Sequence, residues 1–213
     1  MICTSILEDN YSDFDRKMKG ESFVEIRLDR AKLSDMEIEK IFSRDIKTIA
    51  TCRKDIYSDS KRRSILKKSV LSGADFIDIE IESDTDYLSD LISYSKRFNC
   101  KLIISFHDYD KTPSQNDLIK IVERGKSFGA DIVKIAVKVN SKTDLERVVS
   151  LYSMGDGKTK IIAIGMGKLG RVSRVLANFF GAEITFASKD SKSKMTECQL
   201  TKEDLIKAVE LID

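Results

Sequence analysis

A single lysine lies inside an otherwise apolar run, Ile-Val-Lys-Ile-Ala-Val, at residues 132–137. Such a run is typical of a β-strand buried on both faces, where a lysine is rarely tolerated for stability alone. Burial and neighbouring cations favour the neutral amine, which is a nucleophile that forms imines with ketones and aldehydes. Lys134 is therefore the first candidate catalytic residue. The alternative is a lysine whose stem reaches past the strand end to water.

The only histidine of the chain, His107, follows another apolar run at residues 101–106. Imidazole titrates close to neutrality, so His107 is the candidate proton shuttle, and a purely structural histidine is the alternative. Glu80 ends the preceding run and can orient an imidazole by a hydrogen bond. The order Glu80, His107, Lys134 thus places an orienting group, a base and a nucleophile on three successive predicted strands.

Further charged residues recur along or just after the predicted strands, and they are Glu25, Arg27, Asp29, Arg53 and Asp78. Side chains alternate along a strand, so Glu25, Arg27 and Asp29 share one face, as Asp78 does with Glu80. Burying each charge costs several kcal/mol unless it is paired. We therefore predict a mutually compensating cluster that belongs to a site. For Asp29 or Asp78 alone, a structural ion pair explains the pattern equally well.

The elements that must position these residues follow a regular alternation. Short apolar or alternating runs predict strands at residues 2–7, 22–28, 46–52, 75–81, 101–106, 131–137, 160–164 and 183–187. The segments between them show the i, i+3, i+4 apolar spacing of surface helices. Helix N-caps are expected at Ser34, Asp84, Ser114 and Thr201.

Eight alternating βα units predict an α/β fold in which parallel strands close into a (β/α)8 barrel. We expect one barrel domain over residues 1–213, with the active site at the carboxyl ends of the strands. An open, doubly wound sheet is the alternative fold.

Composition narrows the class of protein. Lys plus Arg is 37 and Asp plus Glu is 35, a balance that argues against a nucleic-acid binder with a basic face. The four cysteines form no C-x-x-C pair, which favours reduced thiols over disulfides or zinc. No apolar run is long enough for a membrane span, and the first residues lack the pattern of a signal peptide. We expect a cytoplasmic protein that acts on a small molecule without a metal.

Residues 165–170, Gly-Met-Gly-Lys-Leu-Gly, match the dinucleotide fingerprint G-x-G-x-x-G. That motif normally opens the first βα unit, whereas here it lies in the seventh. A tight βα turn is the better interpretation, with Ser173 and Arg174 directed toward the site. An arginine near a helix N-terminus can clamp a carboxylate or a phosphate. Residues 61–68 are interpreted as a solvated basic helix face, and residues 188–199 as a lid or a mobile loop.

Six short motifs together resemble type I 3-dehydroquinate dehydratase, the Schiff-base lyase of the shikimate pathway, over nearly the whole chain. They are V-E-I-R-L-D (24–29), T-C-R (51–53), D-I-E (78–80), S-F-H-D (105–108), K-I-A-V (134–137) and V-S-R (172–174). The resemblance implies dehydration of 3-dehydroquinate to 3-dehydroshikimate, a step of chorismate and aromatic amino acid biosynthesis. It implies no metal and no organic cofactor, and it makes a homodimer plausible.

The resemblance also implies a role for each site residue. Lys134 forms the imine, His107 moves the protons and Glu80 orients His107. The remaining residues bind the substrate: Arg174 its carboxylate; Glu25, Arg27 and Arg53 its hydroxyls or their supports; Ser5 the site wall; and Gln199 the closing lid.

The lid is where this sequence departs from the family. The family usually has a serine or threonine four residues before the lid glutamine, and then Ala-Pro-Gly. Here the segment reads Met195-Thr196-Glu197-Cys198-Gln199, so lid geometry and substrate affinity are expected to differ. Two alternatives stay open: a class I aldolase, which needs a phosphate site in the last βα loops, and a non-catalytic barrel relative with a degenerate lid.

Overall fold

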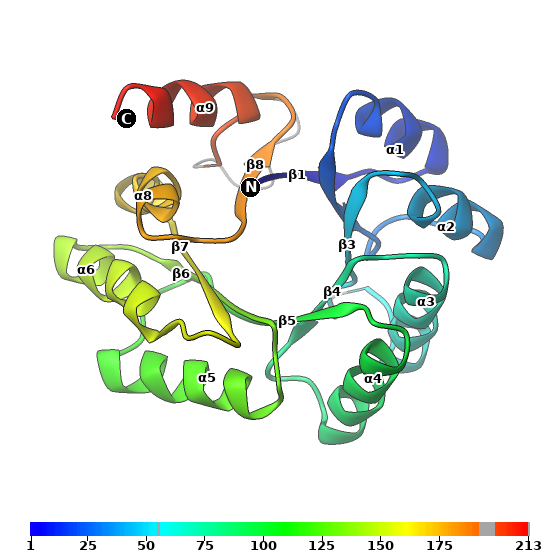
Figure 1. Ribbon diagram of the computed structural model, residues 1–213, viewed down its shortest axis with the longest axis horizontal. Coiled ribbons are helices and arrows are strands. Elements are labelled where there is room, and N and C mark those ends of the chain that lie inside the picture. Colours follow the sequence, from blue (N-terminus) through cyan, green and yellow to red (C-terminus); the bar gives the residue numbers. More distant parts are fainter. Residues whose placement is uncertain (55, 192–198, 213) are drawn as a thin grey trace. The chain divides into compact units, whose positions relative to one another are not determined.

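The computed structural model describes residues 1–54, 56–191 and 199–212, in which strands and helices alternate along the chain (Figure 1). The chain divides into two compact units. The first consists of Thr4–Ile103, and the second combines Met1–Cys3 with Ile104–Asp213. Each unit is described by itself.

The Thr4–Ile103 unit contains four βα repeats. Its elements are β1 (Ile2–Leu7), α1 (Tyr11–Met18), β2 (Phe23–Arg27), α2 (Asp35–Phe42), β3 (Lys47–Thr51), α3 (Asp59–Leu71), β4 (Phe76–Glu80) and α4 (Thr85–Arg97). The strands are parallel and adjacent in chain order. The register pairs Ser5 with Glu25, Arg27 with Thr51, and Thr51 with Asp78. Polar residues of four neighbouring strands therefore come together toward the carboxyl ends.

Local sequence explains where the helices begin. The Ser34 hydroxyl accepts from the Glu37 backbone N–H, and the Glu37 carboxylate accepts from the Ser34 backbone, which is a capping box at the start of α2. Ser114 and Thr201 also accept from backbone N–H groups, as predicted. Asp84 occupies the N-cap position of α4 but makes no side-chain capping hydrogen bond.

Helix α3 corrects one prediction. The basic segment at residues 61–68 was expected to be a solvated face, but Arg62 is only 2% exposed. The helix packs against α2, α4, β3 and β4, and its buried stripe recurs at helical spacing. That stripe consists of Arg62, Ile65, Leu66, Ser69 and Val70. The prediction was wrong because the run of positive charge masked the periodicity.

The second unit continues the alternation from Ile104 onward. Its elements are β5 (Lys101–Asp108), α5 (Gln115–Ser127), β6 (Ile132–Lys138), α6 (Lys142–Ser150), the 3-10 helix η1 (Leu151–Met154), β7 (Lys160–Met166), α7 (Gly167–Gly170), α8 (Ser173–Phe179), β8 (Thr185–Ser188) and α9 (Lys202–Glu210). Strands β6 and β7 are parallel, with Lys134 opposite Ile162. Nearly every residue of both strands is buried, as expected for parallel strands covered on both faces.

Residues of α8, β8 and α9 share a small hydrophobic core. Val175, Ala187, Leu200 and Leu205 pack together there. The backbone N–H of Ser188 donates to the Leu200 carbonyl at 2.9 Å, which brings the residues just before α9 to the end of β8. No helix among the described residues is long and apolar enough to cross a membrane.

The glycines of the G-x-G-x-x-G segment serve a close backbone contact. A Cβ added to Gly170 would lie 2.4 Å from the carbonyl carbon of Gly165, so neither position accommodates a side chain. The backbone N–H of Gly165 donates to the Ser173 hydroxyl at 2.7 Å. This geometry supports the interpretation as a tight βα turn. Ser173, predicted to face the site, holds that turn instead.

Candidate active site

The predicted site residues fall in both units. Ser5, Glu25, Arg27, Arg53 and Glu80 belong to the Thr4–Ile103 unit, whereas His107, Lys134, Arg174 and Gln199 belong to the other. The predicted cooperation of Glu80 with His107 and Lys134 joins residues of different units and stays a prediction.

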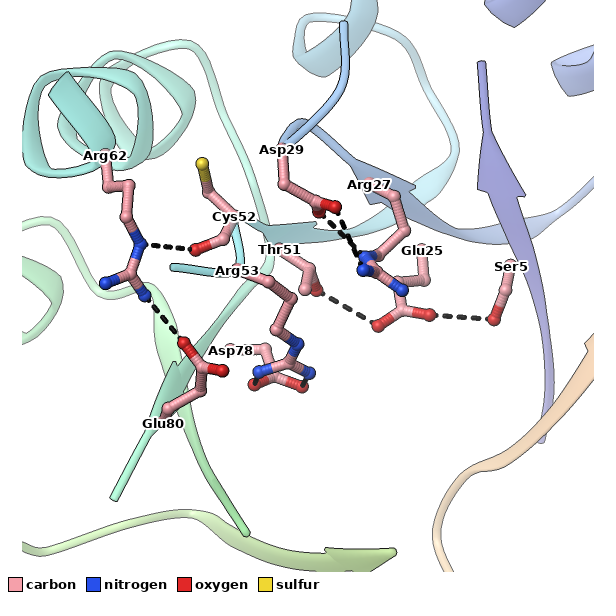
Figure 2. A network of polar contacts seen from close by, with 10 residues as sticks. All are labelled: Ser5, Glu25, Arg27, Asp29, Thr51, Cys52, Arg53, Arg62, Asp78 and Glu80. Carbon is pink, nitrogen blue, oxygen red and sulfur yellow. Dashed lines mark hydrogen bonds and ion pairs between the residues drawn. The ribbon is translucent and has the colours of Figure 1, made fainter. Parts of the chain in front are cut away.

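Glu25 is held by two hydroxyl groups from the neighbouring strands. The Ser5 Oγ donates to Glu25 Oε2 at 2.7 Å, and the Thr51 Oγ1 donates to Glu25 Oε1 at 3.0 Å (Figure 2). All three residues are buried, so these bonds replace hydration of the carboxylate. Both carboxylate oxygens accept a hydrogen bond, and these two bonds fix the orientation of the Glu25 side chain.

Arg27 forms an ion pair with the residue two positions further along the chain. Its Nε donates to Asp29 Oδ1 at 2.8 Å and its Nη2 donates to Asp29 Oδ2 at 3.0 Å. Burial acts to lower the pKa of Arg27, but the hydrogen bond and charge of Asp29, with help from Glu25, raise it. The Asp29 carboxylate thus compensates the charge of Arg27 within the Thr4–Ile103 unit.

Arg53 forms a similar bidentate ion pair with Asp78 of the next strand, β4. Its Nη1 and Nη2 donate to the two oxygens of Asp78 at 2.8 and 3.0 Å, and both side chains are buried. Burial acts to lower the pKa of Arg53, yet the Asp78 carboxylate raises it above its usual value through its charge and its hydrogen bonds. The predicted charge compensation is present here, with Asp29 and Asp78 each acting as the partner of one arginine.

Glu80 is bound by a residue that sequence reasoning assigned to the solvent. The Arg62 Nη2 donates to Glu80 Oε2 at 2.7 Å, and Figure 2 shows Arg62 reaching from helix α3 to the end of β4. The signal that could have revealed Arg62 is its spacing from Leu66 and Val70, which places it on the apolar stripe of α3.

Cys52, next to Arg53, is not a nucleophile of this site. Burial, assisted by the charge of Asp29, raises the pKa of the Cys52 thiol to about 12. The thiol therefore stays protonated at neutral pH. Cys3, Cys52 and Cys100 are buried free thiols.

In the second unit, Lys134 lies on β6 with only 5% of its surface exposed. Its Nζ lies 4.0 Å from the centre of the Phe186 ring. An ammonium over an aromatic face is stabilised by the ring quadrupole. Phe186 is a site residue that sequence reasoning missed, although an aromatic residue in the short strand at 183–187 was a usable signal.

Arg174 reaches the same residue from helix α8. Its Nη1 donates to the Phe186 backbone carbonyl at 3.1 Å, and it is 5% exposed. The structure thus brings Lys134 and Arg174 together around one residue, which offers a ring face to the amine and a carbonyl to the guanidinium.

The other two predicted residues of this unit are His107 and Gln199. His107 is half-buried on β5, and its ring stacks on Tyr109 with centroids 6.2 Å apart. Gln199 is buried just before α9. The predicted lid residues Met195–Cys198 lie outside the described residues. Over the part of the chain that is described, no group of three or more His, Cys, Asp and Glu is arranged to hold a metal ion.

Comparisons with known proteins agree with this chemistry. The family model of type I 3-dehydroquinase matches residues 2–213. The chain is 35% identical to a 3-dehydroquinate dehydratase of Methanococcus maripaludis over 205 residues, which is 91% of each protein. It is 34% identical to the enzyme of that name from Methanocaldococcus jannaschii, over 91% of this chain and 90% of the relative.

Solved structures establish the fold class. The type I 3-dehydroquinate dehydratase of Clostridium difficile superposes with a TM-score of 0.87 at 23% identity, covering 99% of this chain and 91% of that one. The likeness confirms the predicted (β/α)8 barrel fold.

Proposed function

The chain belongs to the type I 3-dehydroquinase family, and we propose that it dehydrates 3-dehydroquinate to 3-dehydroshikimate through an imine on Lys134. The observation that carries the proposal is the buried Lys134 amine, 4.0 Å from the Phe186 ring, in a strand whose other residues are apolar except Lys138 at its end. Such surroundings suit a nucleophile whose cationic imine needs stabilisation without bulk water.

The proposed reaction begins with attack of the neutral Lys134 amine on the substrate ketone, and loss of water gives an iminium ion. The iminium withdraws electrons from the neighbouring carbon, so a proton there becomes acidic. His107 takes that proton as the general base, and the electron pair forms an enamine.

Elimination follows from the same enamine. Its electron pair expels the hydroxyl on the β-carbon, and His107 returns its proton so that the hydroxyl leaves as water. Hydrolysis of the conjugated imine releases the enone and restores Lys134. In this proposal Glu80 fixes the orientation of His107.

Substrate binding is assigned to the other predicted residues. Arg174 is the partner of the substrate carboxylate, because its planar fork matches a carboxylate bidentately. The ion-paired and hydroxyl-bearing cluster of the first unit binds substrate hydroxyls or supports the groups that do. Its members are Ser5, Glu25, Arg27 and Arg53, and Gln199 contributes from the segment before α9.

Several finer proposals accompany this function. We place the reaction in the shikimate pathway in the cytoplasm, with a homodimer as the working unit and no nucleic-acid partner. Sedimentation of the purified protein tests the dimer. A class I aldolase is disfavoured by the family, and ultraviolet absorbance separates the two reactions because dehydration alone creates a conjugated enone.

Borohydride trapping tests the proposal directly. Sodium borohydride added during turnover of 3-dehydroquinate reduces the imine, and mass spectrometry should then place a covalent adduct on Lys134. The Lys134→Ala variant should gain no mass and should not increase ultraviolet absorbance. Lys138→Ala is the matched control, since Lys138 lies on the same strand β6. An adduct on Lys138, or turnover by Lys134→Ala, would contradict the assignment.

A further inference from the structure

We propose that Arg62 is a positioning residue that holds the Glu80 carboxylate in its working orientation. The inference rests on the proposed function, in which Glu80 orients His107. It concerns a residue outside the motifs that carry the family resemblance. Its basis is the contact pattern around one buried guanidinium in the Thr4–Ile103 unit.

Every nitrogen of the Arg62 guanidinium has a defined acceptor. Its Nε donates to the Cys52 carbonyl at 2.9 Å, its Nη1 to Asp59 Oδ1 at 2.7 Å and its Nη2 to Glu80 Oε2 at 2.7 Å. The central carbon lies 4.8 Å from the centre of the Tyr87 ring. These four contacts fix both the position and the plane of the guanidinium, which a single ion pair would not do.

The contacts of Arg62 connect a helix to the ends of two strands. Asp59 belongs to the first turn of α3, and Tyr87 to the first turn of α4. The Cys52 carbonyl directly follows β3, and Glu80 is the last residue of β4. Arg62 therefore fixes the carboxyl ends of β3 and β4, which is where a barrel of this fold places its chemistry.

The Glu80 ion pair differs from the neighbouring Arg53–Asp78 pair. Arg53 binds both oxygens of Asp78, and the Asp78 side chain has no exposed surface. Arg62 binds Oε2 of Glu80, and the Glu80 side chain keeps 14% exposure. Arg53 thus binds both oxygens of the Asp78 carboxylate, whereas the Arg62–Glu80 ion pair leaves Glu80 Oε1 outside the salt bridge.

This difference suits a carboxylate that must orient another group. A glutamate has several rotatable bonds, and an orienting carboxylate is effective only when its own rotamer is fixed. A bond to one oxygen fixes the rotamer and keeps the second oxygen for an imidazole N–H.

The chain offers a matched control in the next residue. Arg63 also lies on α3, and its guanidinium also contacts the Tyr87 ring, with 5.5 Å to the centre. It pairs with Asp90 rather than with Glu80. Replacing Arg63 therefore removes a cation and a ring contact from the same helix without touching the proposed catalytic group.

The test compares Arg62→Met, Arg62→Lys and Arg63→Met in steady-state kinetics on 3-dehydroquinate, after thermal melts have shown which variants are folded. Arg62→Met should lower kcat about 10²-fold with KM changed less than about threefold, as expected for a misplaced acid-base group. Arg62→Lys should recover part of kcat, since it keeps the charge and loses the fork. Arg63→Met should keep kcat within about twofold of the wild type.

A double-mutant cycle separates positioning from stability. If Arg62 acts through Glu80, then Arg62→Met combined with Glu80→Gln should lower kcat no further than Glu80→Gln alone. Borohydride trapping on Lys134 should persist in every variant, because the nucleophile is unchanged. Additive losses in the cycle, or a folded Arg62→Met with wild-type kcat, would overturn the proposal.

The remaining outcomes are also decisive. If Arg62→Met does not fold, Arg62→Lys and its cycle with Glu80→Gln carry the test. If neither variant folds, Arg62 is structural and the proposal is wrong. A wild-type protein that fails to dehydrate 3-dehydroquinate would refute the proposed function itself. Normal wild-type turnover, a deficient Glu80→Gln and unaffected Arg62 variants would refute this inference alone.

Discussion

The contacts of buried charged side chains differ between the two units. In Thr4–Ile103, arginines meet carboxylates: Arg27 binds Asp29, Arg53 binds Asp78 and Arg62 binds Glu80. In the other unit, two buried cations share one aromatic residue: the Phe186 ring faces Lys134, and the Phe186 carbonyl accepts from Arg174.

The difference distinguishes residues that stabilise the fold around a site from residues that bind or react with a substrate. A buried ion pair is internally neutral, and breaking it leaves an uncompensated charge, so its loss is felt mainly as instability. A ring face or a carbonyl is a weaker partner, and a substrate carbonyl or carboxylate can compete with it. Substitutions in the Arg27–Asp29 and Arg53–Asp78 pairs should therefore affect folding more, and those at Lys134 and Arg174 should affect turnover more.

The largest effect on turnover, after loss of the nucleophile, is expected at His107. His107→Ala should lower kcat roughly 10²- to 10⁴-fold, the usual share of a positioned acid-base group. Imine formation should be slower but should persist, because Lys134 is intact. The measurement is enone absorbance alongside borohydride trapping. Near wild-type dehydration would show that another group, such as Glu80, is the base.

The fold was largely predictable because its signals are local and repeated. Each predicted strand matches an observed one within a few residues, and the helix starts at Ser34, Ser114 and Thr201 have the expected caps. Alternation of strands and helices then leaves few topologies. These patterns are encoded within a few residues, so they can be read without tertiary contacts.

The largest effect on stability is expected at the buried Arg53–Asp78 pair. Asp78→Asn removes the strongest partner of the buried Arg53 charge and should lower the free energy of unfolding by about 3–5 kcal/mol. Asp29→Asn is the control, because its partner Arg27 keeps 20% exposure and can be rehydrated. Urea denaturation measures both. Equal losses in the two variants would contradict the distinction by burial.

Arg174 should show a milder effect, in binding rather than in folding. Losing one partner of a buried charged contact costs roughly 2–5 kcal/mol, so Arg174→Ala should raise KM strongly. Arg174→Lys should recover only part of that loss, because an ammonium lacks the fork. The melting temperature of Arg174→Ala should fall less than that of Asp78→Asn. Unchanged KM in both Arg174 variants would make Arg174 structural.

The site was only partly predictable, and the misses share one cause. Lys134 and His107 are conspicuous because a charged or titratable group interrupts or follows an apolar run. Arg62 was hidden within a basic segment, and Phe186 was not singled out from the predicted strand at residues 183–187. Their importance lies in which atoms they contact, across 18 residues for Arg62 with Glu80. Single-sequence patterns carry no information on such pairings.

The smallest predicted effect isolates the two roles of Phe186. Phe186→Leu removes the ring from Lys134 and keeps the backbone carbonyl that accepts from Arg174. A cation–π contact stabilises the cationic imine by about 0.5–2 kcal/mol, so less imine forms without the ring and the rate of borohydride trapping on Lys134 should fall roughly 2- to 30-fold. KM should change little, because the Arg174 contact is made by the main chain. Phe186→Tyr retains an aromatic face and should keep most of the trapping rate, which distinguishes the ring from simple packing.

If Phe186→Leu and Phe186→Tyr lose trapping equally, packing volume and not the ring face supports the amine. If KM instead rises with unchanged trapping, Phe186 serves the Arg174 side of the site, and the contrast between the two units rests on Arg174 alone.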